Sequence, residues 1–188
     1  SLAGWFGADR EEFTAACRLA QALGVSILGG STGLLDGDHD ALAEIARAHG
    51  VRLGYENHPE RSTAEMYAKI GTGNEDVIGF CVDTGWFGTH GYDAELALRE
   101  VYPRLFHVHL KDVLSPGGHE TCRYGRGCVP IRGCVHTLAE LGVVFLLFSL
   151  GLEFNLKKLG RVGFFFMVAA TTETRWMPSV TEFPSRQG

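Results

Sequence analysis

Three side chains that could bind one metal ion or move a proton recur at nearly equal intervals along the chain. Glu56 and Asp83 each end an apolar stretch, and 27 residues separate them. His109 lies 26 residues after Asp83, in the apolar stretch 105–110. An interval of that size is about one strand plus one helix of a parallel sheet. We therefore expect two carboxylates and an imidazole to meet at one sheet edge, a set that suits a divalent metal.

Each of these residues also has a plain structural explanation. Glu56 could pair with a neighbouring cation, and Asp83 could cap a turn or helix that begins at Thr84. His107 and His109 alternate along one strand, and we expect them to face opposite sides of it. His109 lies nearer the carboxyl end and is the better ligand candidate, so we expect His107 to pack or to support the site.

Four further side chains fall in predicted loops after the same strands and are candidates for substrate binding. Trp86 could stack on a sugar ring, and Lys111 could hold a hydroxyl or a phosphate. A role in packing or at the surface stays open for each. The four candidates are His58, Trp86, Lys111 and His119.

The composition indicates a globular core and no nucleic-acid surface. The 188 residues are 45% hydrophobic and carry a net charge of −5, whereas binding along nucleic-acid phosphates needs a basic face. Five cysteines and an N-terminus without a secretory signal predict reduced thiols and a cytoplasmic location. The spacing of Cys122, Cys128 and Cys134 is not that of a CxxC zinc site, so we expect packing or loop thiols.

Strand and helix signals alternate through the first three quarters of the chain. This alternation is typical of βαβ units and a parallel sheet, and no strand is followed by the GxGxxG of dinucleotide-binding folds. A closed eight-stranded barrel needs about 250 residues, more than the chain offers before Gly142. The predicted strands are 25–29, 51–55, 77–82 and 105–110; the predicted helices begin at Asp9, Asp40, Ser62, Asp93 and Ile131, and the last ends at Leu141.

The composition changes after Gly142. The stretches 143–152 and 163–170 are apolar, with a basic segment between them, but neither reaches the 18 or so residues of a membrane-spanning helix. They could be the ends of two membrane helices around a cytoplasmic turn, or a barrel strand and a buried helix. We predict a first domain at 1–142, an apolar and possibly foreign segment at 143–170, and a disordered tail at 171–188.

Residues 10–142 resemble a sugar phosphate isomerase/epimerase of the xylose-isomerase-like TIM-barrel superfamily. The motifs that carry the resemblance are Glu56-Asn57-His58, the stretch 82–86 (Val-Asp-Thr-Gly-Trp) and the stretch 107–112 (His-Val-His-Leu-Lys-Asp). The resemblance implies a partial (β/α) TIM barrel with parallel strands, followed here by an apolar helical segment. It also implies Glu56, Asp83 and His109 as ligands of Mn²⁺, Mg²⁺, Co²⁺ or Zn²⁺.

The resemblance further implies proton transfer next to a metal-bound sugar carbonyl, with Glu56 as the catalytic carboxylate. The family uses two Glu residues on opposite faces of the sugar and a fourth ligand, a Glu that would fall near Leu150. Neither the second Glu nor the fourth ligand stands at its place in this chain. We therefore expect impaired activity unless another chain completes the barrel.

Residues 138–163 resemble a stretch of monovalent cation:proton antiporters, in which a membrane helix runs into a basic turn. The alternative to an enzyme is thus a chimeric or truncated chain, joined near Gly142, without catalytic activity. Membrane association would then be possible through 143–170. An incomplete barrel also leaves sheet edges open, so we expect self-association.

Overall fold

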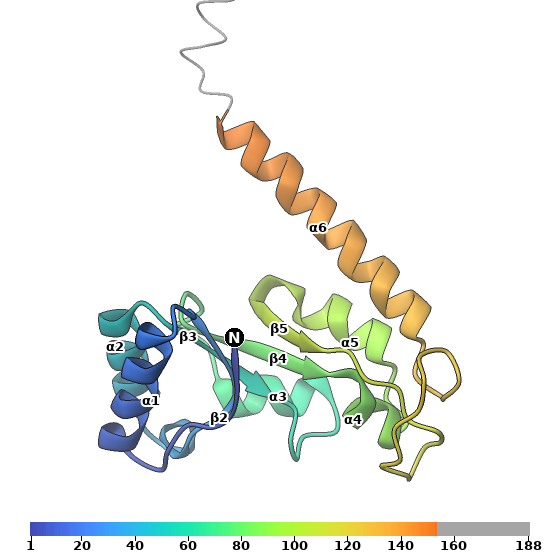
Figure 1. Ribbon diagram of the computed structural model, residues 1–188, viewed down its shortest axis with the longest axis horizontal. Helices are drawn as coiled ribbons and strands as arrows, with labels where there is room; N and C mark the ends of the chain where they lie inside the picture. The colour runs from blue at the N-terminus through green and yellow to red at the C-terminus, as the bar shows by residue number, and fades with distance from the viewer. Residues whose placement is uncertain (154–188) are drawn as a thin grey trace, which may run out of the picture. The chain divides into compact units, whose positions relative to one another are not determined.

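The computed structural model describes residues 1–153, and its centre is a five-stranded parallel sheet (Figure 1). The strands lie in chain order, so each strand pairs with the next one along the sequence. The fold class is therefore confirmed as a partial parallel barrel. The strands are β1 (Leu2–Trp5), β2 (Ile27–Ser31), β3 (Arg52–Glu56), β4 (Ile78–Asp83) and β5 (Leu105–His109).

Helices connect the strands, and short polar side chains fix where most of them begin. Asp9, Ser62 and Asp93 accept backbone N–H bonds at the predicted helix starts. The second long helix differs from the prediction, because Asp38 rather than Asp40 caps it. The helices are α1 (Arg10–Ala22), η1 (Gly33–Asp36), α2 (His39–His49), α3 (Thr63–Ile70), α4 (Thr84–Thr89), α5 (Ala94–Val101), η2 (Tyr102–Arg104) and α6 (Ile131–Glu153).

The apolar core lies where one face of the sheet packs against the helices. Phe80 and Val82 of β4 are fully buried in it, as are Leu28 of β2 and Leu53 of β3. Phe13 of α1 joins the same core. Because side chains of a strand alternate between its two faces, the residues between these core positions point to the other face. That second face carries the candidate site.

Strand β1 was not predicted, because its four residues lack a run of β-branched or large apolar side chains. It forms nonetheless because the backbones of β1 and β2 approach closely, with Gly4 beside Gly30. A Cβ atom on Gly30 would lie 1.9 Å from the carbonyl oxygen of Gly4. Within residues 1–153, β1 and β5 are the two edges of the sheet.

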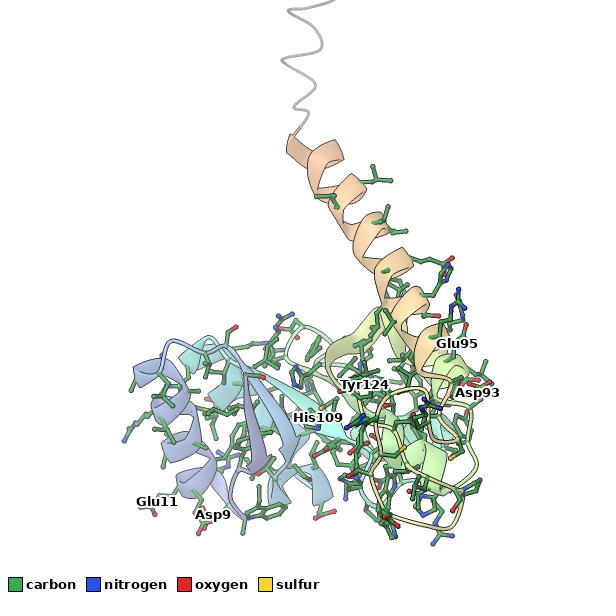
Figure 2. The ribbon with its side chains drawn as sticks, turned by 45° about the vertical axis from the view of Figure 1, so that its right-hand side comes forward. Asp9, Glu11, Asp93, Glu95, His109 and Tyr124 are labelled. Carbon is green, nitrogen blue, oxygen red and sulfur yellow. The ribbon has the colours of Figure 1, made fainter. Side chains whose placement is uncertain are left out.

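Helix α6 continues through Gly142 to Glu153, whereas the sequence predicted a helix that ends at Leu141. Its first turns pack on α5, where Thr137 donates a hydrogen bond of 3.3 Å to Glu95 (labelled in Figure 2). The chain divides into two compact units, Ser1–Glu140 and Leu141–Gly188. The domain limits that the sequence suggested, 1–142, 143–170 and 171–188, stay a prediction.

No helix within residues 1–153 is both long and apolar enough to cross a membrane. The predicted basic segment, the second apolar run and the tail lie outside the described residues. So do residues 154–163 of the stretch that resembles an antiporter.

Candidate metal centre

Glu56, Asp83 and His109 are the last residues of three adjacent strands, β3, β4 and β5. Asp83 lies opposite His109 in the strand register. Nδ1 of His109 lies 2.7 Å from Oε1 of Glu56, a hydrogen bond between residues 53 positions apart. The structure therefore brings Glu56 and His109 into direct contact, with Asp83 on the strand between them (Figure 2 labels His109).

His58, which the sequence suggested for substrate binding, lies between the two carboxylates. Its Nδ1 is 3.7 Å from Oε1 of Glu56, and its Nε2 is 3.8 Å from Oδ2 of Asp83. Ligand atoms of these three residues all lie within 4.8 Å of one another. Carboxylate oxygens with an imidazole nitrogen fit a divalent cation, so His58 joins the candidate ligands.

A second group of possible ligands comprises Glu56, Cys81 and His109, whose ligand atoms also lie within 4.8 Å of one another. Sγ of Cys81 is 3.9 Å from Nε2 of His109. This thiol was not among the residues that the sequence singled out. Alternation along β4 was the signal that could have found it, because Cys81 precedes Asp83 by two residues and shares its face.

Hydrogen bonds on two sides fix the position of Asp83. The buried side chain of Asn57 accepts a bond of 2.7 Å from the Asp83 backbone N–H and donates one of 3.1 Å to its carbonyl. Oδ1 of Asp83 accepts a 3.0 Å bond from the N–H of Trp86 and so caps α4. Its Oδ2 is the oxygen that faces His58, and Nζ of Lys111 lies 3.6 Å away. Capping and a ligand role are therefore compatible.

Glu56 is largely buried yet held in its charged form. Burial alone would raise its pKa, but hydrogen bonds and charge interactions with His58 and His109 outweigh burial, so the pKa of Glu56 is lowered. A carboxylate that stays ionised is available to bind a cation or to accept a proton.

The prediction that His107 and His109 face opposite sides of β5 was wrong. Residues two apart on a strand share a face, and the two imidazole rings lie edge to face with centroids 5.0 Å apart. A Cβ atom on Gly29 would lie 3.2 Å from Cδ2 of His107. Burial, together with nearby positive charge, lowers the pKa of His107 and favours its neutral form.

Trp86 is surrounded by three imidazoles. Its ring centroid lies 4.4 Å from that of His58, 4.5 Å from that of His90 and 5.6 Å from that of His119. The indole N–H donates a 2.8 Å bond to the carbonyl of Glu60. The structure therefore brings three of the four predicted substrate-binding side chains into one aromatic cluster beside the carboxylates.

Lys111, the fourth of these residues, lines a pocket of about 460 Å³ next to Asp83. Tyr124 of the following loop (labelled in Figure 2) lines the same pocket and donates a 2.9 Å bond to the carbonyl of Leu110. The pocket is lined by Leu110, Lys111, Asp112, Thr121, Cys122, Arg123 and Tyr124. The position expected for a fourth family ligand, near Leu150, lies within α6 rather than at a strand end.

Comparison with known families and proteins agrees with this architecture. The family model described as xylose isomerase-like TIM barrel matches residues 7–153. Among curated proteins, inosose dehydratase 1 of Bacillus cereus is 31% identical over 83 residues. The matched part is 43% of this chain and 28% of that protein, so the chain spans less than a third of this relative.

Solved structures share the fold at low sequence identity. A xylose isomerase-like TIM barrel protein from Mycobacterium smegmatis in complex with magnesium has a TM-score of 0.54 and 17% identity, covering 71% of this chain and 56% of that one. D-allulose 3-epimerase from Methylomonas sp. in complex with D-allulose has a TM-score of 0.53 and 15% identity. The match covers 71% of this chain and 52% of that one. This chain thus corresponds to little more than half of each barrel.

Proposed function

Because this chain belongs to the xylose isomerase-like TIM barrel family, we propose that it carries the metal-binding half of a sugar or sugar phosphate isomerase or epimerase. The observation that supports the proposal is the cluster at the ends of β3, β4 and β5. There two groups of possible ligands share Glu56: one comprises Glu56, His58 and Asp83, and the other comprises Glu56, Cys81 and His109.

The proposed ligands are Glu56, Asp83 and His109, with His58 beside them. Oxygen and nitrogen donors of this kind fit Mn²⁺, Mg²⁺, Co²⁺ or Zn²⁺ better than Ca²⁺, which prefers oxygen alone. A divalent cation bound here would act as a Lewis acid on a sugar carbonyl and acidify the neighbouring C–H group. The magnesium complex of the Mycobacterium smegmatis protein supports a metal at this kind of site.

Glu56 is the proposed proton carrier. Its lowered pKa keeps the carboxylate ionised, so it can accept a proton from the carbon next to the carbonyl and return it to the adjacent position. A hydrogen bond to His109 and the nearby ring of His58, 3.7 Å away, orient the carboxylate. One carboxylate serves one face of the sugar, which suits aldose–ketose isomerisation, whereas inversion of a stereocentre needs a second group on the opposite face.

His58, Trp86, Lys111 and His119 are the proposed substrate contacts. Trp86 offers a half-buried ring to the sugar, and Lys111 offers an ammonium group that reaches both Asp83 and the adjoining pocket. An ammonium there suits a sugar hydroxyl or a phosphate. The D-allulose complex of the Methylomonas enzyme supports a sugar as substrate.

The remaining strands and the fourth ligand would have to come from elsewhere. We propose self-association through the open edges of β1 and β5 in a sample of this chain, which light scattering would detect as a mass above that of one chain. The cytoplasmic setting stays a prediction from the cysteine count, and membrane association through 143–170 stays the alternative.

Hydrogen exchange at the carbon next to the carbonyl tests the catalytic proposal without requiring a completed reaction. A panel of ketoses and their phosphates is incubated with Mn²⁺-loaded protein in D₂O and followed by proton NMR. With the wild type we expect one C–H signal to be lost only when metal is present. In Glu56→Gln we expect the exchange rate to fall at least about 100-fold. Glu44→Gln, an exposed carboxylate on α2, is the matched control. Absence of exchange from folded, metal-loaded protein would favour a chain without catalytic activity.

A further inference from the structure

Two cationic side chains line one pocket beside the candidate metal centre. Lys111 and Arg123 both belong to the wall of the pocket of about 460 Å³. Nζ of Lys111 also lies 3.6 Å from Oδ2 of Asp83, so the pocket adjoins a carboxylate that we propose as a metal ligand. A small molecule bound in this pocket would therefore lie next to the proposed reaction centre.

The start of α4 fixes the position of Lys111. The buried hydroxyl of Thr84 accepts a 2.8 Å bond from the N–H of Lys111 and donates one of 2.8 Å to its carbonyl. The lysine side chain passes close to Gly85, where a Cβ atom would lie 2.7 Å from Cγ of Lys111. An ammonium group has more than one N–H donor, so its interaction with Asp83 leaves donors for a ligand in the pocket.

Arg123 is held at the pocket by both of its neighbours in the chain. The N–H of Cys122 donates a 3.1 Å bond to the carbonyl of Asp112, and the hydroxyl of Tyr124 donates one of 2.9 Å to the carbonyl of Leu110. Between these two anchors, the exposed guanidinium of Arg123 has no ion-pair or hydrogen-bond partner in the described part of the chain. Its N–H donors are therefore available to an anion.

Asp112, the acidic residue in the pocket wall, is committed to the loop that follows it. It is 1% exposed. Its Oδ2 accepts bonds of 2.8 and 3.1 Å from the N–H groups of Gly125 and Gly127, and its Oδ1 accepts one of 3.2 Å from that of Val129. Because these N–H groups stabilise the carboxylate, the lysine and the arginine remain the charged groups of the wall that can bind a ligand.

We propose that this pocket binds the phosphate group of the substrate through Lys111 and Arg123, while the sugar carbonyl lies at the metal centre. The inference rests on the proposed function and narrows its substrate class to phosphorylated ketoses or aldoses. Two cationic side chains match the charge of a phosphate monoester, and a guanidinium can bind two phosphate oxygens at once. Because Lys111 adjoins both Asp83 and the pocket, the phosphate and the reacting carbon would lie on either side of it.

Titration with inorganic phosphate, followed by phosphorus NMR, tests the pocket without requiring turnover. The full chain is first freed of metal with EDTA and dialysed, so that phosphate bound to a metal ion does not contribute. We expect saturable binding by the wild type. Arg123→Gln and Lys111→Gln should each lower the affinity at least about tenfold, because each removes charge-assisted hydrogen bonds. Arg126→Gln is the matched control: this exposed arginine of the same loop lies outside the pocket wall, and its replacement should leave the affinity unchanged.

Equal phosphate affinity in Arg123→Gln and Arg126→Gln, or no phosphate binding by the folded wild type, would overturn the phosphate site. Displacement of phosphate by acetate at equal concentration would also overturn it and would indicate a carboxylate site. If Lys111→Gln fails to fold, the comparison of the two arginine variants, both at exposed positions, decides.

The hydrogen-exchange experiment separates this inference from the proposed function. Exchange on unphosphorylated ketoses, together with no phosphate binding, would keep the proposed function and overturn the phosphate site. Phosphate binding that is lost in Arg123→Gln, without exchange on any sugar, would support the phosphate site and contradict the proposed catalysis.

Discussion

At the scale of single residues, Asn57 holds the candidate site together although the proposed chemistry does not use it. It follows the last residue of β3, and its fully buried amide bonds both backbone groups of Asp83. The side chain thereby continues the pairing of β3 with β4 for one residue beyond the end of β3. Asp83 keeps its place because these bonds fix its backbone while its carboxylate faces His58 and Lys111.

Replacement of Asn57 by leucine should weaken both the fold and the metal site. Two backbone groups of Asp83 lose their partner, and each unsatisfied buried group costs about 1–3 kcal/mol. Displacement of the Asp83 carboxylate should lower divalent-metal affinity by about 10–100-fold, the usual cost of removing a group that orients a ligand. Urea denaturation and calorimetric titration measure the two effects. Gln21→Leu, on exposed α1 surface, is the control; unchanged metal affinity in Asn57→Leu would contradict the assignment.

The main residues of the site followed from the sequence because their spacing matched one strand and one helix. Glu56, Asp83 and His109 end adjacent strands as expected. The sequence predicted His58 as a substrate contact. A loop has no regular alternation of side chains, so the sequence could not show that the loop after β3 places the His58 ring between the two carboxylates. The missed Cys81 and the misplaced His107 had one cause, since residues two apart on a strand share a face.

At the scale of elements, the side chain of Arg104 in η2 links the end of α3 to the start of β4. It is 7% exposed, and its guanidinium donates bonds of 2.8 Å to the carbonyls of Gly71 and Ile78. Burial lowers its pKa, although the nearby Glu75 partly opposes that shift. The arginine therefore satisfies carbonyl groups at the entry to β4, the strand that carries Cys81 and Asp83.

Arg104→Met should destabilise the protein by about 2–4 kcal/mol, because charge-assisted bonds are lost and buried carbonyls are left without donors. Methionine keeps the aliphatic volume of the arginine, so the decrease in the free energy of unfolding measures the loss of the polar contacts. The measurement is the free energy of unfolding in urea. Arg99→Met on α5 is the matched control, since Arg99 makes exposed ion pairs and should have a much smaller effect. Equal losses in the two variants would argue against the role given to Arg104.

Helix starts were predictable where a short polar side chain precedes an amphipathic run, as at Asp9, Ser62 and Asp93. The continuation of α6 through Gly142 was not, because a glycine was read as a stop. One glycine inside a helix costs only about 1 kcal/mol relative to alanine, so neighbouring helix-forming residues can carry the helix past it. The sequence alone could not show whether the cost of Gly142 or the helix propensity of its neighbours would be larger.

At the scale of the whole molecule, the described strands make an incomplete barrel. Five parallel strands hold the candidate ligands on one face, while the solved relatives are nearly twice as long as the matched region. All of the proposed ligands lie within the compact unit Ser1–Glu140. Under the proposed function, metal binding would need only this unit, whereas turnover would also need groups beyond it.

Divalent-metal binding by the purified full chain tests that separation most directly. Calorimetric titration with Mn²⁺ and Zn²⁺ is compared among the wild type, Asp83→Asn and His109→Ala. Asparagine retains the cap on α4 but removes the charge, so the loss of a ligand is distinguished from the loss of the helix cap. Asp76→Ala and His136→Ala, exposed residues outside the site, are the controls. We predict one ion per chain in the wild type and the controls, with binding abolished in both site variants; a folded wild-type chain that binds neither ion would contradict the account.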